Sequence, residues 1–129
     1  MKNIEQTYTI HASVDRVWAA LTDPSVIDQW GGGPAVMSAE ENVAFSLWGG
    51  DIYGTNTKMA PLQLIEQDWY SGTEWQTPSH VAFRVTDLHD ATSVHLVHTD
   101  VPAADQADIA DGWITHYMGP IKALLERKV

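Results

Sequence analysis

The feature that most constrains the fold is a change of hydrophobic period along the chain. Segments with period-2 alternation are followed, from Ala104 on, by one long segment with a helical period. The apolar positions of this last segment fall on one stripe, made of Ile109, Trp113, Tyr117, Ile121 and Leu124. Acidic residues come early in the segment and basic residues late, which matches a helix macrodipole. A helix with such a stripe needs an apolar sheet to cover it.

The residues before this helix supply that sheet. Alternation predicts a first strand at Ile4–His11, with Ile4 and Ile10 on its apolar face. The same pattern predicts five further strands and a weaker one, at Val43–Trp48, Asp51–Met59, Leu62–Tyr70, His80–Asp87 and Thr92–Val101, with the weaker one at Ala35–Ser38. Because the connections between these strands are short, we expect an antiparallel meander.

Two short helices are expected between the first strand and the meander. Ser13 can cap the first, and Asp23 or Thr22 can cap a second one that ends at the glycines 31–33. Gly119-Pro120 lies inside the last helix and should bend it near His116. The predicted fold class is therefore α+β, a curved antiparallel sheet wrapped around a long C-terminal helix, in a single domain over residues 1–129.

Charge and composition narrow the function classes. The chain has 17 acidic and seven basic residues, which gives a net charge of −10. Such a field repels nucleic acids and anionic lipids, and the apolar runs are far shorter than the roughly 20 residues that cross a bilayer. We therefore expect neither nucleic acid nor a membrane as a partner. The sequence has no Cys, which excludes disulfides and thiolate chemistry and fits a cytoplasmic protein.

Six stretches, in their order and spacing, carry a family resemblance. They are VWAALTDP followed by Trp30, then FSLWGGDIYG, Pro61 with Trp69, PSHVAFRV, TSVHLVHTDVP and DGWITHYMGPIKALLE. With these stretches the chain resembles the START-like helix-grip domains, and within them the proteins similar to the C-terminal domain of the activator of Hsp90 ATPase. The resemblance implies a sheet that grips the C-terminal helix, often with a cavity between them. It also implies an Hsp90-type chaperone as one protein partner, and relatives with this fold include lipid-binding proteins and polyketide cyclases.

The sequence offers little catalytic equipment. It lacks the HExxH, CxxC, GxSxG, Walker and GxGxxG motifs, and the odd separation of His95 and His98 puts them on opposite faces of a strand. We therefore expect no metal and no cofactor. His98 shares the inward face with Val94 and Leu96, and alternation puts Asp100 there too. His98 is then a core histidine with satisfied hydrogen bonds, a ligand contact, or the acid–base group of a pocket.

Eight residues are candidate ligand contacts, because aromatic and histidine side chains could line a cavity between sheet and helix. They are Trp48, Tyr53, Trp69, Phe83, His98, Trp113, His116 and Tyr117. Core packing is the alternative for Trp69, Phe83 and Trp113. The hydroxyl groups of Tyr53 and Tyr117 favour a pocket or a surface rim instead. No residue is assigned a catalytic role.

Three functions remain open at this point. The first is a non-catalytic module that binds a small hydrophobic or aromatic ligand, or a protein client, in a role related to stress or chaperone function. The second is an enzyme of the polyketide cyclase or aromatase kind that uses His98 in acid–base chemistry. The third, implied by the resemblance alone, is a co-chaperone-like activator of an Hsp90 ATPase. The predicted edge strand Val43–Trp48 could also pair two copies into a homodimer.

Overall fold

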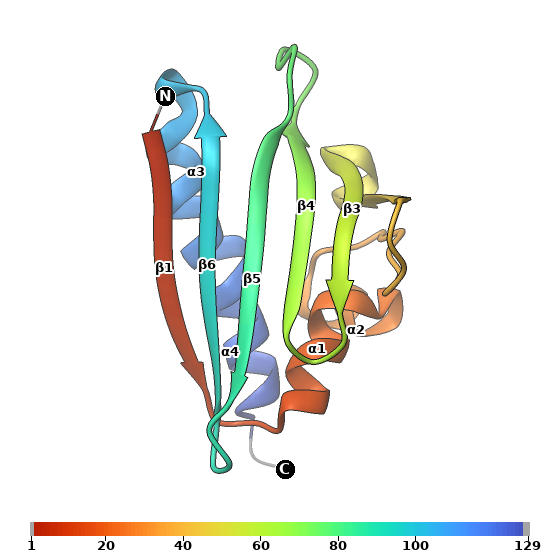
Figure 1. Ribbon diagram of the computed structural model, residues 1–129, viewed down its shortest axis with the longest axis vertical. Helices are drawn as coiled ribbons and strands as arrows, with labels where there is room; N and C mark the ends of the chain where they lie inside the picture. Colours follow the sequence, from red (N-terminus) through yellow and green to blue (C-terminus); the bar gives the residue numbers. More distant parts are fainter. Residues whose placement is uncertain (1, 128–129) are drawn as a thin grey trace.

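The computed structural model describes residues 2–127, which build a six-stranded antiparallel sheet with all helices on one face (Figure 1). The strands are β1 (Lys2–Ile10), β2 (Val43–Leu47), β3 (Ile52–Ala60), β4 (Leu64–Ser71), β5 (Ser79–Asp87) and β6 (Thr92–Val101). Their order is β1-β6-β5-β4-β3-β2, so β2 to β6 form the expected meander and β1 pairs with β6. The predicted helix-grip fold class is confirmed.

The predicted strands agree with the observed ones to within two residues at each end. The exception is Ala35–Ser38, where a single bridge joins Val36 to Ser46 of β2. Both backbone bonds of this bridge are formed, at 2.8 and 2.9 Å, so this segment covers part of the outer edge of β2. Both β1 and β2 are edge strands of the sheet.

The two short helices are α1 (Val14–Thr22) and α2 (Pro24–Trp30). Ser13 caps α1, because its Oγ accepts a hydrogen bond from the Arg16 N–H at 3.4 Å. Asp23 caps α2 by accepting from the Ser25 N–H at 2.9 Å. The helix ends at Gly31, whose φ of 102° is a left-handed conformation that glycine adopts without steric cost. Both helices lie behind β3 and β4 in Figure 1.

The C-terminal helix runs behind β1, β6 and β5 (Figure 1) and has three parts, α3 (Gln106–Gly112), the π-helical turn η3 (Trp113–Met118) and α4 (Gly119–Leu125). The bend expected at Gly119-Pro120 takes the form of this π-helical turn, in which the Gly119 N–H bonds to the Ile114 carbonyl. Because a π-helical turn contains one more residue than an α-helical turn, the buried apolar stripe of the helix shifts by one position after it. Leu125 is therefore buried, whereas Leu124, predicted on the stripe, is only partly buried.

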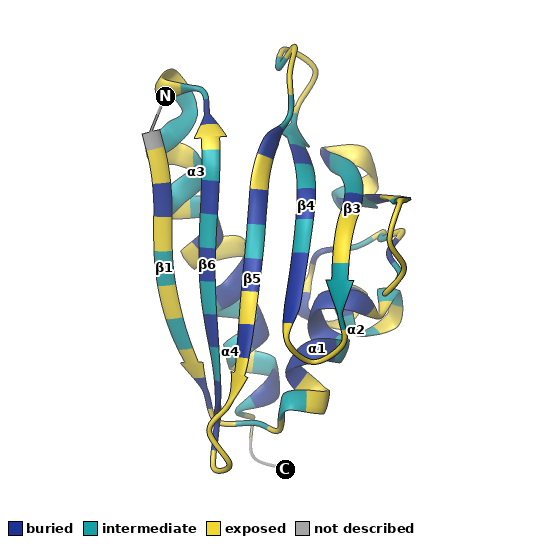
Figure 2. Cartoon of the chain, viewed as in Figure 1, coloured by how far each residue is buried: buried dark blue, intermediate teal, exposed yellow. Residues whose placement is uncertain are grey.

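Strand β6 carries the inward face that the sequence predicts. Val94, Leu96 and His98 are fully buried, whereas His95 faces outward and lies 2.6 Å from Glu5 of β1. Figure 2 shows the resulting alternation of buried and less buried positions along β6. This regular face places His98 beside the C-terminal helix.

The prediction that Asp100 shares the inward face with His98 is wrong. The pairing of β1 with β6 slips between Ile4↔His98 and Lys2↔Val101, so β6 carries one extra residue there. Asp100 takes up the bulge with a φ of 62° and is exposed, and Val101 returns to the core. The Asp100 carboxylate lies 3.4 Å from Nε2 of His80 on the outer face of the sheet.

Candidate functional site

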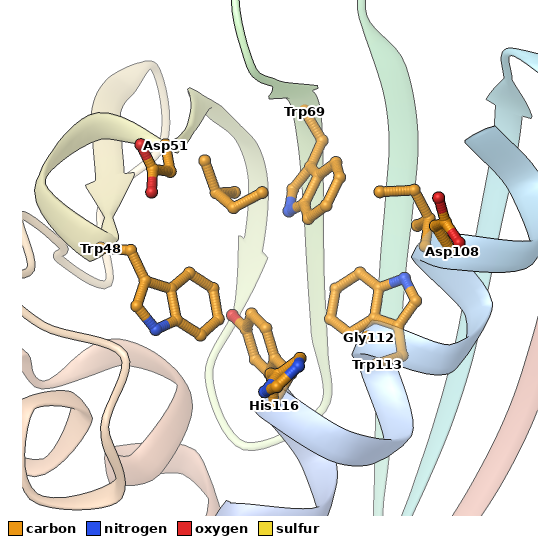
Figure 3. Close-up of a pocket in the computed structure, with 10 residues that line it drawn as sticks. Trp48, Asp51, Trp69, Asp108, Gly112, Trp113 and His116 are labelled. Carbon is orange, nitrogen blue, oxygen red and sulfur yellow. The ribbon is translucent and has the colours of Figure 1, made fainter.

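A pocket of about 300 Å³ opens between the sheet and the C-terminal helix. Its walls come from the turn after β2, the start of β3, the end of β4, and the helix around the junction of α3 with η3 (Figure 3). The ten lining residues are Trp48, Asp51, Ile52, Trp69, Asp108, Ile109, Gly112, Trp113, His116 and Tyr117. This is the sheet-to-helix cavity that the family resemblance implies.

Aromatic rings form the walls of this pocket. Trp69 of β4 and Trp113 of the helix are stacked, with ring centroids 5.4 Å apart and an angle of 28° between planes. The ring centroid of Tyr117 lies 4.6 Å from that of Trp113 and, on the opposite side, 6.0 Å from that of Trp48. Such walls offer both flat faces and ring edges to a ligand.

The indole nitrogen of Trp69 is the one buried side-chain donor of the pocket wall that has no hydrogen-bond partner among residues 2–127. Trp69 itself is 3% exposed. In Figure 3 its nitrogen lies on the side that faces Trp48 across the pocket. A buried N–H without an acceptor costs about 1 to 3 kcal/mol, so a ligand that carries an acceptor would recover this energy.

Behind the pocket wall, His98 is held by a directional chain of hydrogen bonds. The Trp113 indole N–H donates to His98 Nδ1 at 2.9 Å, so a neutral His98 carries its proton on Nε2. That nitrogen lies 2.7 Å from Ser79 Oγ, and the Ser79 hydroxyl donates to the Trp69 carbonyl at 2.7 Å. Every polar atom in the chain of hydrogen bonds therefore has a partner.

Burial keeps His98 neutral. Desolvation, with a smaller electrostatic contribution from His80, lowers the pKa of His98 to about 3. His98 is fully buried and is separated from the pocket by Trp69 and Trp113, which both contact its ring edge-to-face. Its structural role is to fix the position of the Trp113 indole. Burial also raises the pKa of Tyr117, so its hydroxyl stays protonated.

Trp48 is presented to the pocket by a strained turn. Its φ of 51° lies in the left-handed region, which costs a bulky residue about 1 to 2 kcal/mol. Two backbone bonds hold the turn, from the Trp48 N–H to the Gly32 carbonyl at 2.8 Å and from the Gly49 N–H to the Pro34 carbonyl at 3.1 Å. Strain of this kind is frequent at ligand sites.

The mouth of the pocket carries the polar groups. Asp51, from the turn before β3, and Asp108, from α3, are exposed, and Figure 3 shows them on opposite sides of the aromatic walls. His116 is exposed at the same pocket. Among residues 3–127, whose side chains the structure describes, no Lys or Arg lines it.

The pocket unites five of the eight residues that the sequence predicts as ligand contacts, namely Trp48, Trp69, Trp113, His116 and Tyr117. The other three lie elsewhere. Phe83 packs behind Trp113 and Tyr117 with no exposed surface, and His98 lies in the buried chain of hydrogen bonds. Tyr53 is next to the pocket residue Ile52 in the strand, so it faces the other side of the sheet, where it stacks on Tyr70 at 5.0 Å.

Five lining residues are not among the predicted ones, namely Asp51, Ile52, Asp108, Ile109 and Gly112. Helical spacing could have identified three of them, because positions 108, 109 and 112 lie one turn before 112, 113 and 116. Asp51 and Ile52 come directly after the pair of glycines next to Trp48, and their place depends on the turn geometry. Trp75 does not line this pocket. It packs on Trp69 at 6.1 Å and donates to Asp105 at 2.9 Å.

The described part of the chain holds neither a metal cluster nor a membrane-spanning helix. No group of three or more His, Asp or Glu side chains in residues 2–127 could hold a metal ion. No helix in the same range is long and apolar enough to cross a membrane.

Comparison with known proteins places this geometry in a family context. Residues 11–126 match the family model described as "Activator of Hsp90 ATPase homolog 1-like protein". A relative from Dictyostelium discoideum, the activator of 90 kDa heat shock protein ATPase homolog, is 33% identical over 88 residues, which are 64% of this chain and 22% of that protein. The chain spans only 22% to 37% of the length of the curated relatives it matches.

Solved structures share the fold at lower identity. The HSP90 activator PFC0360w from Plasmodium falciparum has a TM-score of 0.89 at 20% identity, covering 97% of this chain and 96% of that one. The Aha1 dimer from Colwellia psychrerythraea has a TM-score of 0.83 at 19% identity, covering 98% and 97%. At this level of identity the likeness concerns the fold.

Proposed function

The chain belongs to the family of activator of Hsp90 ATPase homolog 1-like proteins, and we propose that it is a non-catalytic module whose pocket binds a small, flat hydrophobic or aromatic molecule. One observation carries the proposal. The pocket has three tryptophan walls and a buried indole N–H, that of Trp69, without an acceptor among residues 2–127. Its volume of about 300 Å³ reaches the lower end of the range for small-molecule sites.

The arrangement of His98 favours binding over catalysis. A general acid or base must come within hydrogen-bond reach of the reacting atom. Both ring nitrogens of His98 are already used by Trp113 and Ser79, and His98 does not line the pocket. The cyclase-like alternative would therefore need the chain of hydrogen bonds behind Trp113 to open.

A neutral ketone of naphthalene, 1-acetylnaphthalene, tests the proposal because it combines a flat apolar body with one acceptor. We expect it to raise the melting temperature and to shift the indole N–H signals of Trp48, Trp69 and Trp113 in NMR spectra. The signal of Trp18, which does not line the pocket, should stay unchanged. Mass spectrometry after incubation should recover the ketone intact.

A matched pair of variants locates the binding. A Cβ at Gly112 meets nothing within 4 Å, so Gly112→Ala adds only a methyl group, whereas Gly112→Leu would fill the pocket. We expect Gly112→Leu to abolish the shifts and Gly112→Ala to keep them. The absence of any shift in the natural chain would overturn the proposal. So would time-dependent conversion of the ketone that is lost in His98→Gln, which would favour the enzyme.

A second candidate is activation of an Hsp90-type ATPase, in a stress or chaperone role. It is supported by the family membership and by the Hsp90 activators among the relatives. If the outer surface carries this activity, the chain should raise the ATPase rate of an Hsp90-type chaperone, and Gly112→Leu should do so equally well. An unchanged ATPase rate over a range of concentrations would remove this candidate.

A homodimer through β2 is the third element of the proposal, and the Aha1 dimer with the same fold supports it in general terms. The bridge from Val36 to Ser46 already occupies part of that edge, so only the first residues of β2 are left for pairing. Sedimentation equilibrium would decide, because a dimer through this edge should be broken by Ala44→Pro, which removes an N–H from the strand.

A further inference from the structure

The Asp, Glu, Lys and Arg side chains that line the pocket and its neighbourhood are all acidic. Asp51 and Asp108 stand on opposite sides of its mouth. A neighbouring hollow of about 420 Å³ shares Asp108 and Ile109 with the pocket and adds Glu74 and Asp105. His116 lies at the pocket itself. In the part of the chain that the structure describes, no Lys or Arg lines either hollow.

The carboxylates lie beside aromatic faces. Trp48, Trp69 and Trp113 line the pocket whose mouth carries Asp51 and Asp108. The electron-rich face of an indole attracts a cation that lies within about 6 Å of the ring centre, and Trp is the strongest of the aromatic residues in this respect. Carboxylates and indole faces therefore favour the same kind of group, a positively charged one with a small apolar surface.

The unpartnered Trp69 N–H is an independent sign that a ligand completes this site. Trp69 is 3% exposed, lines the pocket and finds no acceptor among residues 2–127. It needs a hydrogen-bond acceptor, such as a carbonyl oxygen. An anionic ligand could also serve the N–H, but its charge would meet two carboxylates at the mouth and a chain of net charge −10.

We infer that the ligand of this pocket is an organic cation, an aromatic or apolar body with one hydrogen-bond acceptor and an ammonium group. The body packs between Trp48, Trp69 and Trp113, the acceptor lies against the Trp69 N–H, and the ammonium group lies between Asp51 and Asp108. This inference rests on the proposed function, because it names the ligand class of the same pocket.

Three probes that differ in charge test it. They are phenacyltrimethylammonium, its uncharged carbon analogue neopentyl phenyl ketone, and the anion 3-benzoylpropionate, which all carry the same aryl ketone. Binding is measured at about pH 8 and low salt from the indole N–H signals of Trp48, Trp69 and Trp113. We expect the cation to bind about ten-fold more tightly than the neutral ketone, and the anion to bind most weakly.

Variants of the two carboxylates separate charge from shape. Asp51→Asn and Asp108→Asn should each weaken the binding of the cation about three-fold and leave the affinity for the neutral ketone unchanged. Added salt should also weaken the binding of the cation. Asp90→Asn is the matched control, because Asp90 is an exposed residue of the β5–β6 turn that lines neither hollow. Asp90→Asn should leave the affinities for all three probes unchanged.

The outcomes distinguish this inference from the proposed function. If the neutral ketone shifts the indole signals and the cation binds no more tightly, the inference fails and the pocket function stands. If none of the three probes shifts them, the proposed function fails as well. Equal losses in Asp90→Asn and Asp51→Asn would show a general field effect and would overturn the placement of the ammonium group.

Discussion

The indole nitrogen of Trp113 lies 2.9 Å from Nδ1 of His98, and this hydrogen bond ties the C-terminal helix to the centre of the sheet. Its direction matters, because it leaves the His98 proton on Nε2, where Ser79 Oγ accepts it. The wall of the pocket and the interior of the sheet are thereby fixed to each other. This arrangement requires a neutral His98, so protonation of His98 opposes folding.

Stability should therefore fall in mildly acidic solution. The pKa of His98 is lowered from 6.5 to about 3, chiefly by burial. Below about pH 6.5, His98 is protonated in the unfolded chain but stays neutral in the folded chain. The contribution of the neutral His98 to the free energy of unfolding is therefore complete above about pH 6.5, and it is lost between about pH 6.5 and 3 at about 1.4 kcal/mol per pH unit. Unfolding free energies from urea titrations at a series of pH values measure the slope.

His98→Gln provides the comparison for that slope, because Gln does not titrate. Its stability should depend on pH less steeply between about pH 6 and 4 than that of the natural chain, whatever its stability at neutral pH. His89→Asn in the exposed β5–β6 turn, where Asn tolerates the φ of 72°, is the control for removing a histidine outside the core. Identical slopes for the natural chain and His98→Gln would contradict the assignment.

Ser79→Ala should destabilise the fold by about 1 to 3 kcal/mol, because it leaves the His98 Nε2–H and the Trp69 carbonyl without their shared partner in the core. Ser93→Ala is the matched control. Ser93 faces outward from β6, and its change should stay within about 0.5 kcal/mol. Chemical denaturation measures both, and equal effects would show that the chain of hydrogen bonds contributes nothing.

Trp113→Ala should cost about 3 to 5 kcal/mol, as is typical of a large aromatic residue buried in a core. Trp113 is 2% exposed and contacts Trp69, Phe83 and Tyr117. The neighbouring Ile114 is 53% exposed, so Ile114→Ala should cost less than about 1 kcal/mol. A shift below about 1 kcal/mol for Trp113→Ala in denaturant titrations would be inconsistent with its place between helix and sheet.

The period of the hydrophobic pattern was sufficient to predict the fold. Period 2 from Val43 to Val101 and the stripe at Trp113, Tyr117 and Ile121 together require a sheet that covers a helix, whatever the details of the turns. The same reasoning failed where one residue is inserted. The bulge at Asp100 and the π-helical turn before Gly119 each change which side the next residues face. The bulge has no strong local signal, and Gly119-Pro120 predicts a bend without predicting its π-helical form.

The candidate site was only half predictable for a related reason. Residue type identifies aromatic side chains, but it does not tell which face of the sheet Tyr53 occupies or whether Phe83 is exposed to a cavity. The mouth of the pocket depends on the left-handed conformation of Trp48, which brings Asp51 and Ile52 to the pocket. That conformation is held by backbone bonds to Gly32 and Pro34, which are contacts between distant segments that no local pattern reports.

Gly112 and Gly119 lie two turns apart in the C-terminal helix, and they should respond oppositely to the same change. A Cβ at Gly119 would lie 2.2 Å from the Ile114 carbonyl oxygen, the acceptor of the π-helical bond, so Gly119→Ala should push the turn apart and cost about 1 to 3 kcal/mol. A Cβ at Gly112 meets nothing within 4 Å, so Gly112→Ala should stabilise the helix by about 0.5 to 1 kcal/mol.

The π-helical turn also orients Trp113 and Tyr117, so Gly119→Ala should shift the indole N–H signal of Trp113. Gly112→Ala should leave the hydrogen bond from Trp113 to His98 intact. Denaturant titrations and NMR spectra of the two variants test this, and a neutral Gly119→Ala would mean that the helix can revert to a regular α-helical turn without loss.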